Sequence, residues 1–324
     1  MAELTYREAV ARGIAQEMRR DDRVVLLGED VAAAGGVFKA TPGLLEEFGP
    51  RRVRDTPISE QAIAGAAAGA AMTGLRPIAE IMFSDFFAVC WDIVANQIAK
   101  SRYMTAGQVG FPLVIRTANG AGLRFGAQHS QAVENWAMAV PGLKVVAPAT
   151  PADVIGLLAA AVRDPDPVLF FEQKALYPIR DEVPDGELVD RLGTAVVRRP
   201  GTDCTLLALG AMVPRALAAA DALAAEGVSA TVVDVRSLVP LDARTICAEV
   251  ARTGVAVTVE ENPRLCGWGA EVVSLLVEEV WDELDAPPVR VTTPHVPVPS
   301  AADLEDAALP SVERVAAAVR GVLG

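Results

Sequence analysis

Histidine, cysteine and aromatic residues are scarce in this chain of 324 residues. Its two histidines are too few for a multi-histidine metal site, and its four cysteines form no CxxC pair. Widely spaced cysteines favour a reduced, cytoplasmic chain over a disulfide or zinc scaffold. Aromatic residues make up 5% of the sequence and hydrophobic residues 52%. Because the excess is mostly Ala, Val and Leu, helices and buried parallel strands are favoured over an all-β sandwich.

Basic residues are also in the minority, with 29 Lys and Arg against 42 Asp and Glu, a net charge of -13 and a pI near 4.7. No run of five or more basic residues exists, so nucleic acid and anionic membrane surfaces are poor partners. An acidic surface suits a basic protein partner, although many enzymes are simply acidic. No uncharged stretch reaches the roughly 20 residues that span a bilayer, and the charged first twenty residues are unlike a signal peptide.

Several motifs of common enzyme classes are absent. There is no GxGxxG after the first predicted strand and no GxxxxGK[ST], so no usual dinucleotide or phosphate cradle is encoded. There is also no GxSxG and no HExxH. If the chain acts on phosphorylated or charged small molecules, something else must hold the phosphates.

Alternating strand-like and helical segments fill both halves of the chain. In the second half, apolar runs predict strands at 204–210, 228–238, 255–262 and 288–294, with helices at 212–227, 242–254 and 269–284. In the first half, strands are predicted at 24–28, 77–82, 112–117, 143–147 and 167–172, with helices at 5–20, 59–74, 85–104, 130–139 and 151–163. This alternation is typical of α/β domains with open, mostly parallel sheets.

The stretch 173–203 is poor in periodicity and contains three prolines, which indicates a linker. We therefore expect a first domain at 1–180, a linker at 181–203 and a second domain at 204–324. Ligands of open α/β sheets bind beyond the carboxyl ends of the strands. Glu29, Ser84, Asp85 and the loop up to His129 fall at such ends.

The stretch RDTPISEQAIAGAAAGAAMTGLRP, residues 54–77, carries one carboxylate, Glu60, before a run of alanine and glycine. Ser59 is expected to cap a helix here, which places Glu60 in its first turn. Gly65 and Gly69 are four residues apart, a spacing that allows close helix packing. Taken alone, Glu60 fits an acid that complements the helix dipole as well as it fits a functional group.

Three further segments attract attention, each with an ordinary structural alternative. His129 lies in NGAGLRFGAQHSQ, a glycine-rich loop, and is either functional or a capping or surface residue. FSDFF at 83–87 holds three of the nine phenylalanines, which is also compatible with core packing. RDPDP at 163–167 is a turn in which Asp164 and Asp166 are either ligands or turn acids.

Taken together, these segments carry a family resemblance. LTYREAVARGIAQEM, LLGEDVAAAGGVFKAT, RVRDTPISEQAIAGAAAGAAMTGLRPIAEIMFSDF, DIVANQIAKSRYM, AQHSQ, PGLKVVAP, AAVRDPDPVLFFE and VTVEEN follow in order from about residue 4 to 313. The chain resembles the β subunit of the thiamin-diphosphate-dependent E1 component of 2-oxo acid dehydrogenase complexes, in the transketolase-like superfamily. The resemblance implies a thiamin pyrimidine-binding domain followed by a transketolase C-terminal-like domain.

The resemblance also implies roles for single residues. Glu60 matches the glutamate that hydrogen-bonds N1′ of the cofactor's aminopyrimidine, and Phe86 matches the aromatic residue that packs on this ring. Ile58 is a further expected cofactor contact. A carboxylate shares a proton with N1′ best when it is partly removed from water. A lone acid beside an Ala/Gly helix is suited to this. His129 matches the histidine near thiazolium C2 that takes part in reductive acylation. Glu29 matches an acidic residue in a proposed proton relay between paired active sites.

Metal ions and partners follow from the same resemblance. A structural potassium site is implied for Leu113, Ala161, Val162, Asp164 and Asp166, although family members often carry asparagine where this chain has Asp166. Mg²⁺ and the diphosphate are held by the α subunit through a GDG motif, which this chain lacks. The implied assembly is an α₂β₂ heterotetramer that delivers acyl groups to a lipoyl-bearing E2.

The substrate stays open between pyruvate, acetoin and branched-chain 2-oxo acids, with pyruvate preferred. AQHSQ resembles the pyruvate and acetoin branches, and IRTANGAGLR with TTPHVPVPSAADLEDAALPS resembles acetoin dehydrogenase β chains. His295, in the latter stretch, is expected at the surface or an interface. Two other functions remain: a split transketolase or 1-deoxyxylulose-phosphate-synthase relative, and a non-catalytic scaffold subunit. Glu60, Phe86 and His129 together argue against the scaffold.

Overall fold

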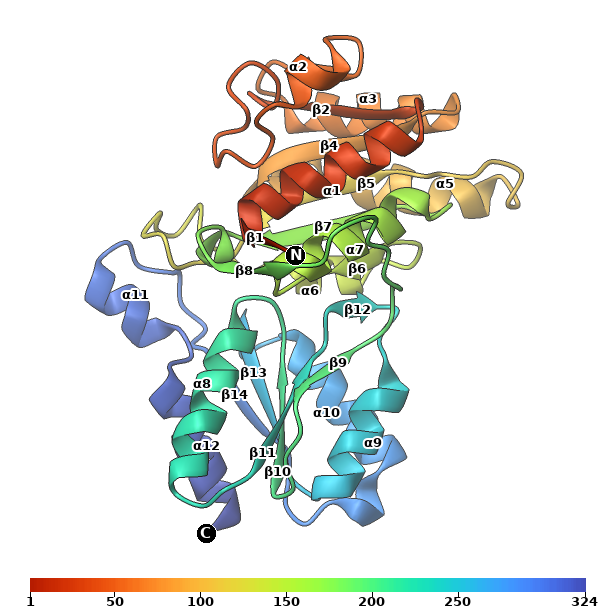
Figure 1. The fold of residues 1–324 in the computed structure, drawn as a ribbon. Helices are drawn as coiled ribbons and strands as arrows, with labels where there is room; N and C mark the ends of the chain where they lie inside the picture. The colour runs from red at the N-terminus through yellow and green to blue at the C-terminus, as the bar shows by residue number, and fades with distance from the viewer. The chain divides into compact units, whose positions relative to one another are not determined.

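A computed structural model describes every residue from Met1 to Gly324. The chain forms two compact units, each built around its own sheet (Figure 1). The first comprises residues 1–119 and 136–192, and the second comprises residues 120–135 and 193–324. None of the helices is both long enough and apolar enough to cross a bilayer.

The first unit contributes six parallel strands to its sheet. They are β2 (Val24–Gly28), β3 (Val53–Asp55), β4 (Arg76–Phe83), β5 (Val114–Asn119), β6 (Lys144–Val146) and β7 (Val168–Gln173). They lie in the order β6-β7-β5-β4-β2-β3, and each neighbouring pair is parallel. β5 and β7 are buried along their whole length, as expected of apolar strands covered on both faces. The five strands predicted in this half are confirmed within two residues.

Helices cover both faces of this sheet (Figure 1). One face carries α1 (Tyr6–Arg20) and α7 (Pro151–Arg163), which pack on each other, and the other carries α3 (Glu60–Met72) and α4 (Phe87–Asp92). The predicted helix at 85–104 continues from α4 through a π-helical stretch (Ile93–Ile98) into α5 (Ala99–Met104). The helix predicted at 130–139 is shorter, α6 (Glu134–Met138). α2 (Leu44–Phe48) precedes β3.

The start of α1 shows how local chemistry sets these boundaries. Thr5 Oγ1 accepts a hydrogen bond from Glu8 N (3.2 Å), while Glu8 Oε2 accepts one from Thr5 N (2.7 Å). This reciprocal capping box satisfies two helix-end donors. The buried face of α1 then packs on α7, where Gly13 allows close approach to Ile155.

The second unit contains a five-stranded sheet. Its strands are β9 (Val196–Arg199), β10 (Cys204–Ala208), β11 (Ala230–Asp234), β13 (Ala256–Pro263) and β14 (Val289–Thr293). The order is β14-β13-β10-β11-β9, and only β9 is antiparallel to its neighbour. One face is covered by α8 (Met212–Ala225) and α12 (Val312–Leu323), the other by α9 (Ala243–Thr253) and α10 (Trp268–Glu279) (Figure 1). β12 (Ser237–Val239) and α11 (Ala302–Ala308) complete the unit.

The segment predicted as a linker contains regular structure. β8 (Arg180–Val183) pairs antiparallel with β1 (Ala2–Thr5), and β9 pairs antiparallel with β11. Such short edge strands have little periodicity of their own and depend on a partner strand far away in the sequence. The contact boundary lies between Leu192 and Gly193, and residues 120–135 pack with the second unit.

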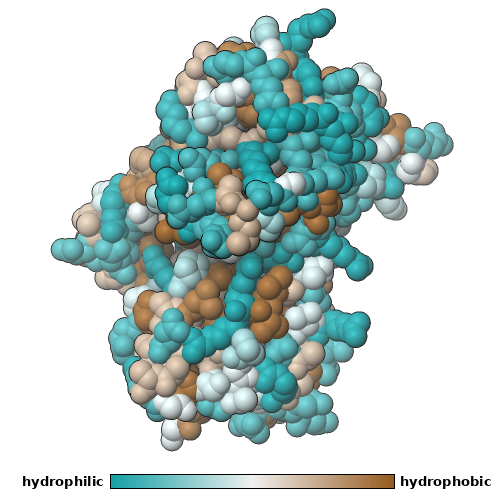
Figure 2. All heavy atoms as spheres, in the orientation of Figure 1, coloured by the Kyte–Doolittle hydropathy of each residue, from teal (hydrophilic) through white to brown (hydrophobic).

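A buried ion-pair network crosses the first sheet. Arg116 on β5 donates to Glu172 on β7 through Nε and Nη2, both at 2.6 Å, and its Nη1 contacts Glu80 on β4. Glu80 and Arg116 are register partners on adjacent strands. The Tyr177 hydroxyl donates to Glu172 Oε2 at 2.8 Å. All these side chains are at most 7% exposed, so the network lies in the core. By contrast, the face of the molecule seen in Figure 2 is largely hydrophilic, with separate hydrophobic patches.

Candidate active site

The topology of the first sheet marks one place as a binding crevice. The connection from β2 leads outward to β3, whereas the chain from β4 proceeds in the opposite direction to β5. Neighbouring strands whose connections diverge define a topological switch point, where open α/β sheets bind ligands at the carboxyl ends. Glu29 follows β2 directly, and the short 3₁₀ helix Ser84–Phe86 follows β4. α3, which begins with Glu60, packs on both strands.

Glu60 is the first residue of α3 and is only 7% exposed. Ser59 occupies the N-cap position with an extended backbone, but its side chain makes no capping hydrogen bond. The prediction that Ser59 occupies the cap and Glu60 the first turn is therefore confirmed, but the cap is made without a side-chain hydrogen bond. Burial of Glu60 agrees with the expectation of a carboxylate partly removed from water.

Glu29 is the second buried acid of the crevice. It is 6% exposed, and its Oε1 atom is buried without a hydrogen-bond partner. Burial raises the pKa of Glu29, and the charges of Glu60 and Asp30 raise it further. The structure thus brings Glu29 and Glu60 close enough to influence each other. Burial and the neighbouring negative charge therefore both favour the neutral form of Glu29.

Replacing Glu29 by glutamine is expected to remove a pH dependence of stability. Since the pKa of Glu29 is raised above its ordinary 4.5 in the folded chain, its contribution to stability is complete below that value and is lost as the pH rises through the raised pKa. Glu29→Gln should therefore equal the wild type at acidic pH and exceed it at neutral pH. Urea unfolding across pH 4–8 measures this difference. Glu313→Gln, an exposed acid, is the control, and identical curves for Glu29→Gln and the wild type would contradict the expectation.

An aromatic residue and a thiol lie in the segment that follows β4, and the thiol is close to Glu60. Phe86 is half-buried, and its ring contacts that of Phe83 edge-on at a centroid distance of 5.3 Å. Cys90 is fully buried; burial, followed by the charge of Glu60, raises the pKa of its thiol to about 12. Cys90 therefore lies near Glu60 as a neutral group. Sequence reasoning missed it, although its place in the helix after FSDFF was available as a signal. Ile58 is 83% exposed.

His129 lies in the loop after β5, whose residues 120–135 belong to the second unit. Its backbone N donates to the Gly126 carbonyl at 3.3 Å, which closes a tight turn, and the side chain is half-buried. The loop therefore packs as part of the second unit, and its histidine is half-buried there.

The residues expected to hold potassium lie before β5 and around the end of α7: Leu113, Ala161, Val162, Asp164 and Asp166. Lys144 Nζ lies 2.7 Å from both oxygens of Asp164 and 3.3 Å from Asp166 Oδ2, and Arg102 contacts Asp166. The Val162 carbonyl accepts a hydrogen bond from Arg76 at 2.7 Å. Because protein cations already neutralise both carboxylates, these side chains do not fit as potassium ligands, and no group of three or more metal-binding side chains exists elsewhere.

The crevice does fit the pyrimidine end of thiamin diphosphate. It offers a buried acid pair with one orphaned oxygen, and the 3₁₀ helix that follows β4 carries a half-buried aromatic ring, Phe86. Glu60 would hold the ring nitrogen, and Phe86 would pack on the ring. The chain offers no glycine-rich phosphate loop and no GDG segment for the diphosphate end.

Comparison with known proteins agrees with this geometry. Residues 2–180 match the transketolase pyrimidine-binding domain, and residues 193–315 match the transketolase C-terminal domain. A solved split-gene transketolase, described as an inactive beta4 tetramer, superposes on this chain with a TM-score of 0.81 and 28% sequence identity. The superposition covers 99% of this chain and 98% of the transketolase chain. Fold and site thus define a two-domain α/β protein of the transketolase type.

Curated relatives narrow the family. The chain is 44% identical to the acetoin:2,6-dichlorophenolindophenol oxidoreductase subunit beta of Bacillus subtilis, over 99% of this chain and 97% of the relative. It is 45% identical to the pyruvate dehydrogenase E1 component subunit beta of Rhizobium meliloti, over 99% and 70%. It is 44% identical to the 2-oxoisovalerate dehydrogenase subunit beta of Bacillus subtilis, over 99% and 98%. The chain belongs to this family of thiamin-dependent E1 β subunits, which are oxidoreductases.

Proposed function

We propose that this chain, together with an α subunit, catalyses the oxidative decarboxylation of a 2-oxo acid, with pyruvate as the first candidate, and the transfer of the acyl group to a lipoyl-bearing E2. The observation that carries the proposal is the buried pair of Glu29 and Glu60 at the switch point of the first sheet. Family membership supplies the reaction class, and the acid pair supplies a proton-handling group where a pyrimidine ring fits.

Each residue then has a defined task. Bound thiamin diphosphate supplies an acidic C–H group that becomes the nucleophile. Glu60 holds a proton at N1′ of the aminopyrimidine ring, which a buried carboxylate does better than a solvated one. Glu29 stabilises the protonated state of the pair, because a second charge beside Glu60 is unfavourable. Phe86 and Ile58 orient the ring, and His129 acts in the transfer of the acyl group to the lipoyl sulfur.

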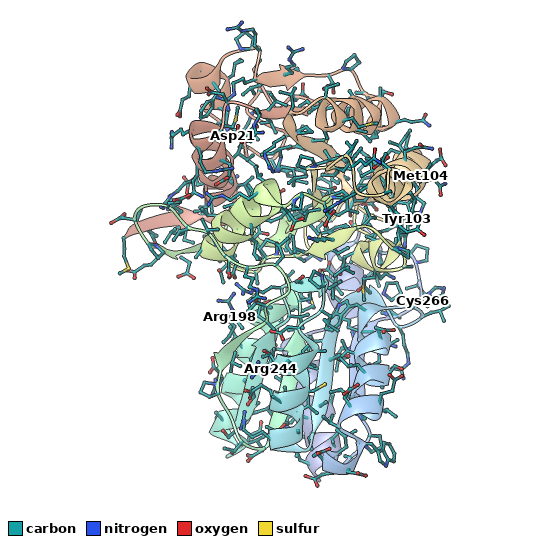
Figure 3. The ribbon with its side chains drawn as sticks, turned by 90° about the vertical axis from the view of Figure 1, so that its right-hand side faces the viewer. Asp21, Tyr103, Met104, Arg198, Arg244 and Cys266 are labelled. Carbon is teal, nitrogen blue, oxygen red and sulfur yellow. The ribbon has the colours of Figure 1, made fainter.

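The α subunit in this proposal supplies the diphosphate and Mg²⁺ site that the chain lacks, within an α₂β₂ assembly. Several features of the first unit favour a partner surface. A side chain built on Gly65 or Gly69 meets no atom within 4 Å, so their face of α3 is open. Tyr103 and Met104, at the end of α5 (Figure 3), are 89% and 74% exposed. Two adjacent large side chains left exposed at the end of a helix favour a partner surface here.

Acetoin cleavage with acetyl transfer to lipoyl-E2 is the second candidate function. Its support is the 44% identity with an acetoin oxidoreductase β subunit that aligns over 97% of its length. The test is co-expression with a candidate α chain and an assay of thiamin-diphosphate- and Mg²⁺-dependent reduction of an artificial acceptor. Pyruvate, branched 2-oxo acids and acetoin are compared in parallel. Activity with one substrate, only when both chains are present, supports the proposal; activity of this chain alone contradicts it.

Replacing His129 by alanine is expected to separate the two half-reactions. The acylation of lipoyl-E2 should fall by roughly 10²-fold or more, because a positioned acid–base group contributes that much. Decarboxylation measured with an artificial acceptor should fall far less. The two rates are measured on the same αβ preparation, with His295→Ala, the other histidine, as the matched control. Equal losses of rate in both half-reactions would contradict the role assigned to His129.

A further inference from the structure

The loop that carries His129 is closed at its base within the second unit. Gly120 N donates to the Gln131 carbonyl at 3.0 Å, so the two ends of the loop meet. Gly120 adopts φ +81°, and a Cβ at this position would lie 2.6 Å from Glu261 Oε1. Glycine is therefore required at 120, both for its backbone conformation and for the close approach of the Glu261 carboxylate.

Two carboxylates hold consecutive backbone amides of this loop. Ala121 N donates to Glu261 Oε1 at 2.5 Å, and Gly122 N donates to Glu305 Oε1. Glu261 is on β13 and is 9% exposed, while Glu305 is on α11 and is fully buried. Hydrogen bonds from amides to carboxylates are charge-assisted and stronger than those between neutral groups. We call Glu261 and Glu305 the carboxylate clasp.

Further contacts fasten the same loop on both sides of the histidine. Asn262 Nδ2 donates to the Ala132 carbonyl at 2.8 Å in a buried position. Arg124 adopts φ +65°, and its guanidinium donates to Asp306 Oδ2 at 2.8 Å and to the Ala302 carbonyl at 3.0 Å. The second unit therefore holds the loop both before and after His129.

Because the clasp is buried, its hydrogen bonds matter for the stability of the loop conformation. Neither Glu261 nor Glu305 faces open solvent, so each carboxylate is held where an unbonded charge is unfavourable. The charge of Glu305 is partly balanced by Arg124, whose Nη1 lies 3.5 Å from Oε2. The clasp is thus a buried arrangement whose carboxylates depend on the loop amides for hydrogen bonds, which favours one conformation of the loop over others.

We infer that Glu261 and Glu305 are positioning residues for His129: they fix the loop so that its imidazole stays placed for acyl transfer. The inference rests on the role of His129 under the proposed function. Acyl transfer between a bound group and a mobile lipoyl arm depends on orientation, and a displacement of about 1 Å is enough to slow such a step by about 10²-fold. Glu261 and Glu305 thereby affect the rate of acyl transfer through the position of His129.

The test combines structural and kinetic measurements on the αβ complex. Amide hydrogen exchange at Ala121 and Gly122 is compared between the wild type, Glu305→Ala, Glu305→Gln and Glu261→Ala. Protection should fall about 10-fold or more in the alanine variants, since a hydrogen bond to a charged group is lost. Glu305→Gln keeps an oxygen acceptor and should recover part of the protection. Glu313→Ala removes an exposed acid of α12 and should change nothing.

In the same variants, kcat for lipoyl acylation should fall about 10-fold, while artificial-acceptor turnover and the KM for the 2-oxo acid stay within about twofold. Unchanged protection at both amides in folded Glu305→Ala and Glu261→Ala overturns the clasp. Lost protection with unchanged acylation overturns the positioning role. If acylation also survives His129→Ala, the proposed role of His129 fails while the clasp stands, so the two failures are distinguishable.

Discussion

Glu60→Gln is expected to abolish thiamin-diphosphate-dependent turnover of the αβ complex, with a loss of at least about 10²-fold. A glutamine amide keeps the size of the side chain but cannot share a proton with N1′ of the aminopyrimidine ring. Because Glu60 is buried beside Glu29, replacing one of two repelling acids does not remove a stabilising partner. The folded chain should therefore be at least as stable as the wild type.

The measurement is acceptor reduction under saturating substrate and cofactor, with unfolding of the same preparation followed by circular dichroism. Glu47→Gln, an exposed acid of α2, is the control and should keep full activity. Glu60→Asp tests geometry, because it keeps the carboxylate but shortens its reach. Near-normal turnover of Glu60→Gln would remove Glu60 from the mechanism, and unfolding of this variant would assign it a structural role instead.

Arg116→Met is expected to destabilise the first unit by about 3–5 kcal/mol, the typical cost of removing one partner of a buried ion pair. Arg116 is 2% exposed and binds Glu172 through two hydrogen bonds, while its remaining nitrogen contacts Glu80. Without the guanidinium, two carboxylates stay in the core without their cation. This is the largest stability effect that the buried network predicts.

Urea unfolding of the isolated chain measures this loss. A triple variant that adds Glu80→Gln and Glu172→Gln removes the unpaired charges and should recover most of the stability, since a neutral core costs less than a broken ion pair. Arg19→Met, whose ion pair with Glu47 is exposed, is the control and should cost at most about 1 kcal/mol. Equal losses in Arg116→Met and the triple variant would contradict the electrostatic account.

Elements with a strong local signal were predictable from the sequence. β2 begins and ends where the apolar run at 24–28 does, and α7 begins at the proline that follows a capping threonine. Elements with a weak local signal were not predicted. β8 and β9 fall in a segment expected to be a linker, and they went unnoticed because an edge strand depends on the strand with which it pairs. Ser59 has the right residue type for a cap, yet its side chain makes no capping bond.

The candidate site divides in the same way. Glu60 is evident in the sequence as the lone charge at the start of an Ala/Gly helix, and its role and that of Phe86 come from the family resemblance. Cys90 and the carboxylate clasp were not found. Cys90 belongs to the site only because the fold places it near Glu60. Glu305 accepts a hydrogen bond from Gly122, from which it is separated by 183 residues in the sequence. Likewise, the cations around Asp164 and Asp166 were not evident from the turn sequence.

Local patterns and residue types were enough to predict the α/β class and most strands and helices, and to show that the chain has no phosphate-binding motif. The folded chain was needed to show that Glu29 and Glu60 lie close enough to influence each other, since the strand order of the sheet brings their segments together. It also showed that the His129 loop packs with the second unit. Two carboxylates from β13 and α11 hold that loop, and such contacts form only when distant segments are folded against each other.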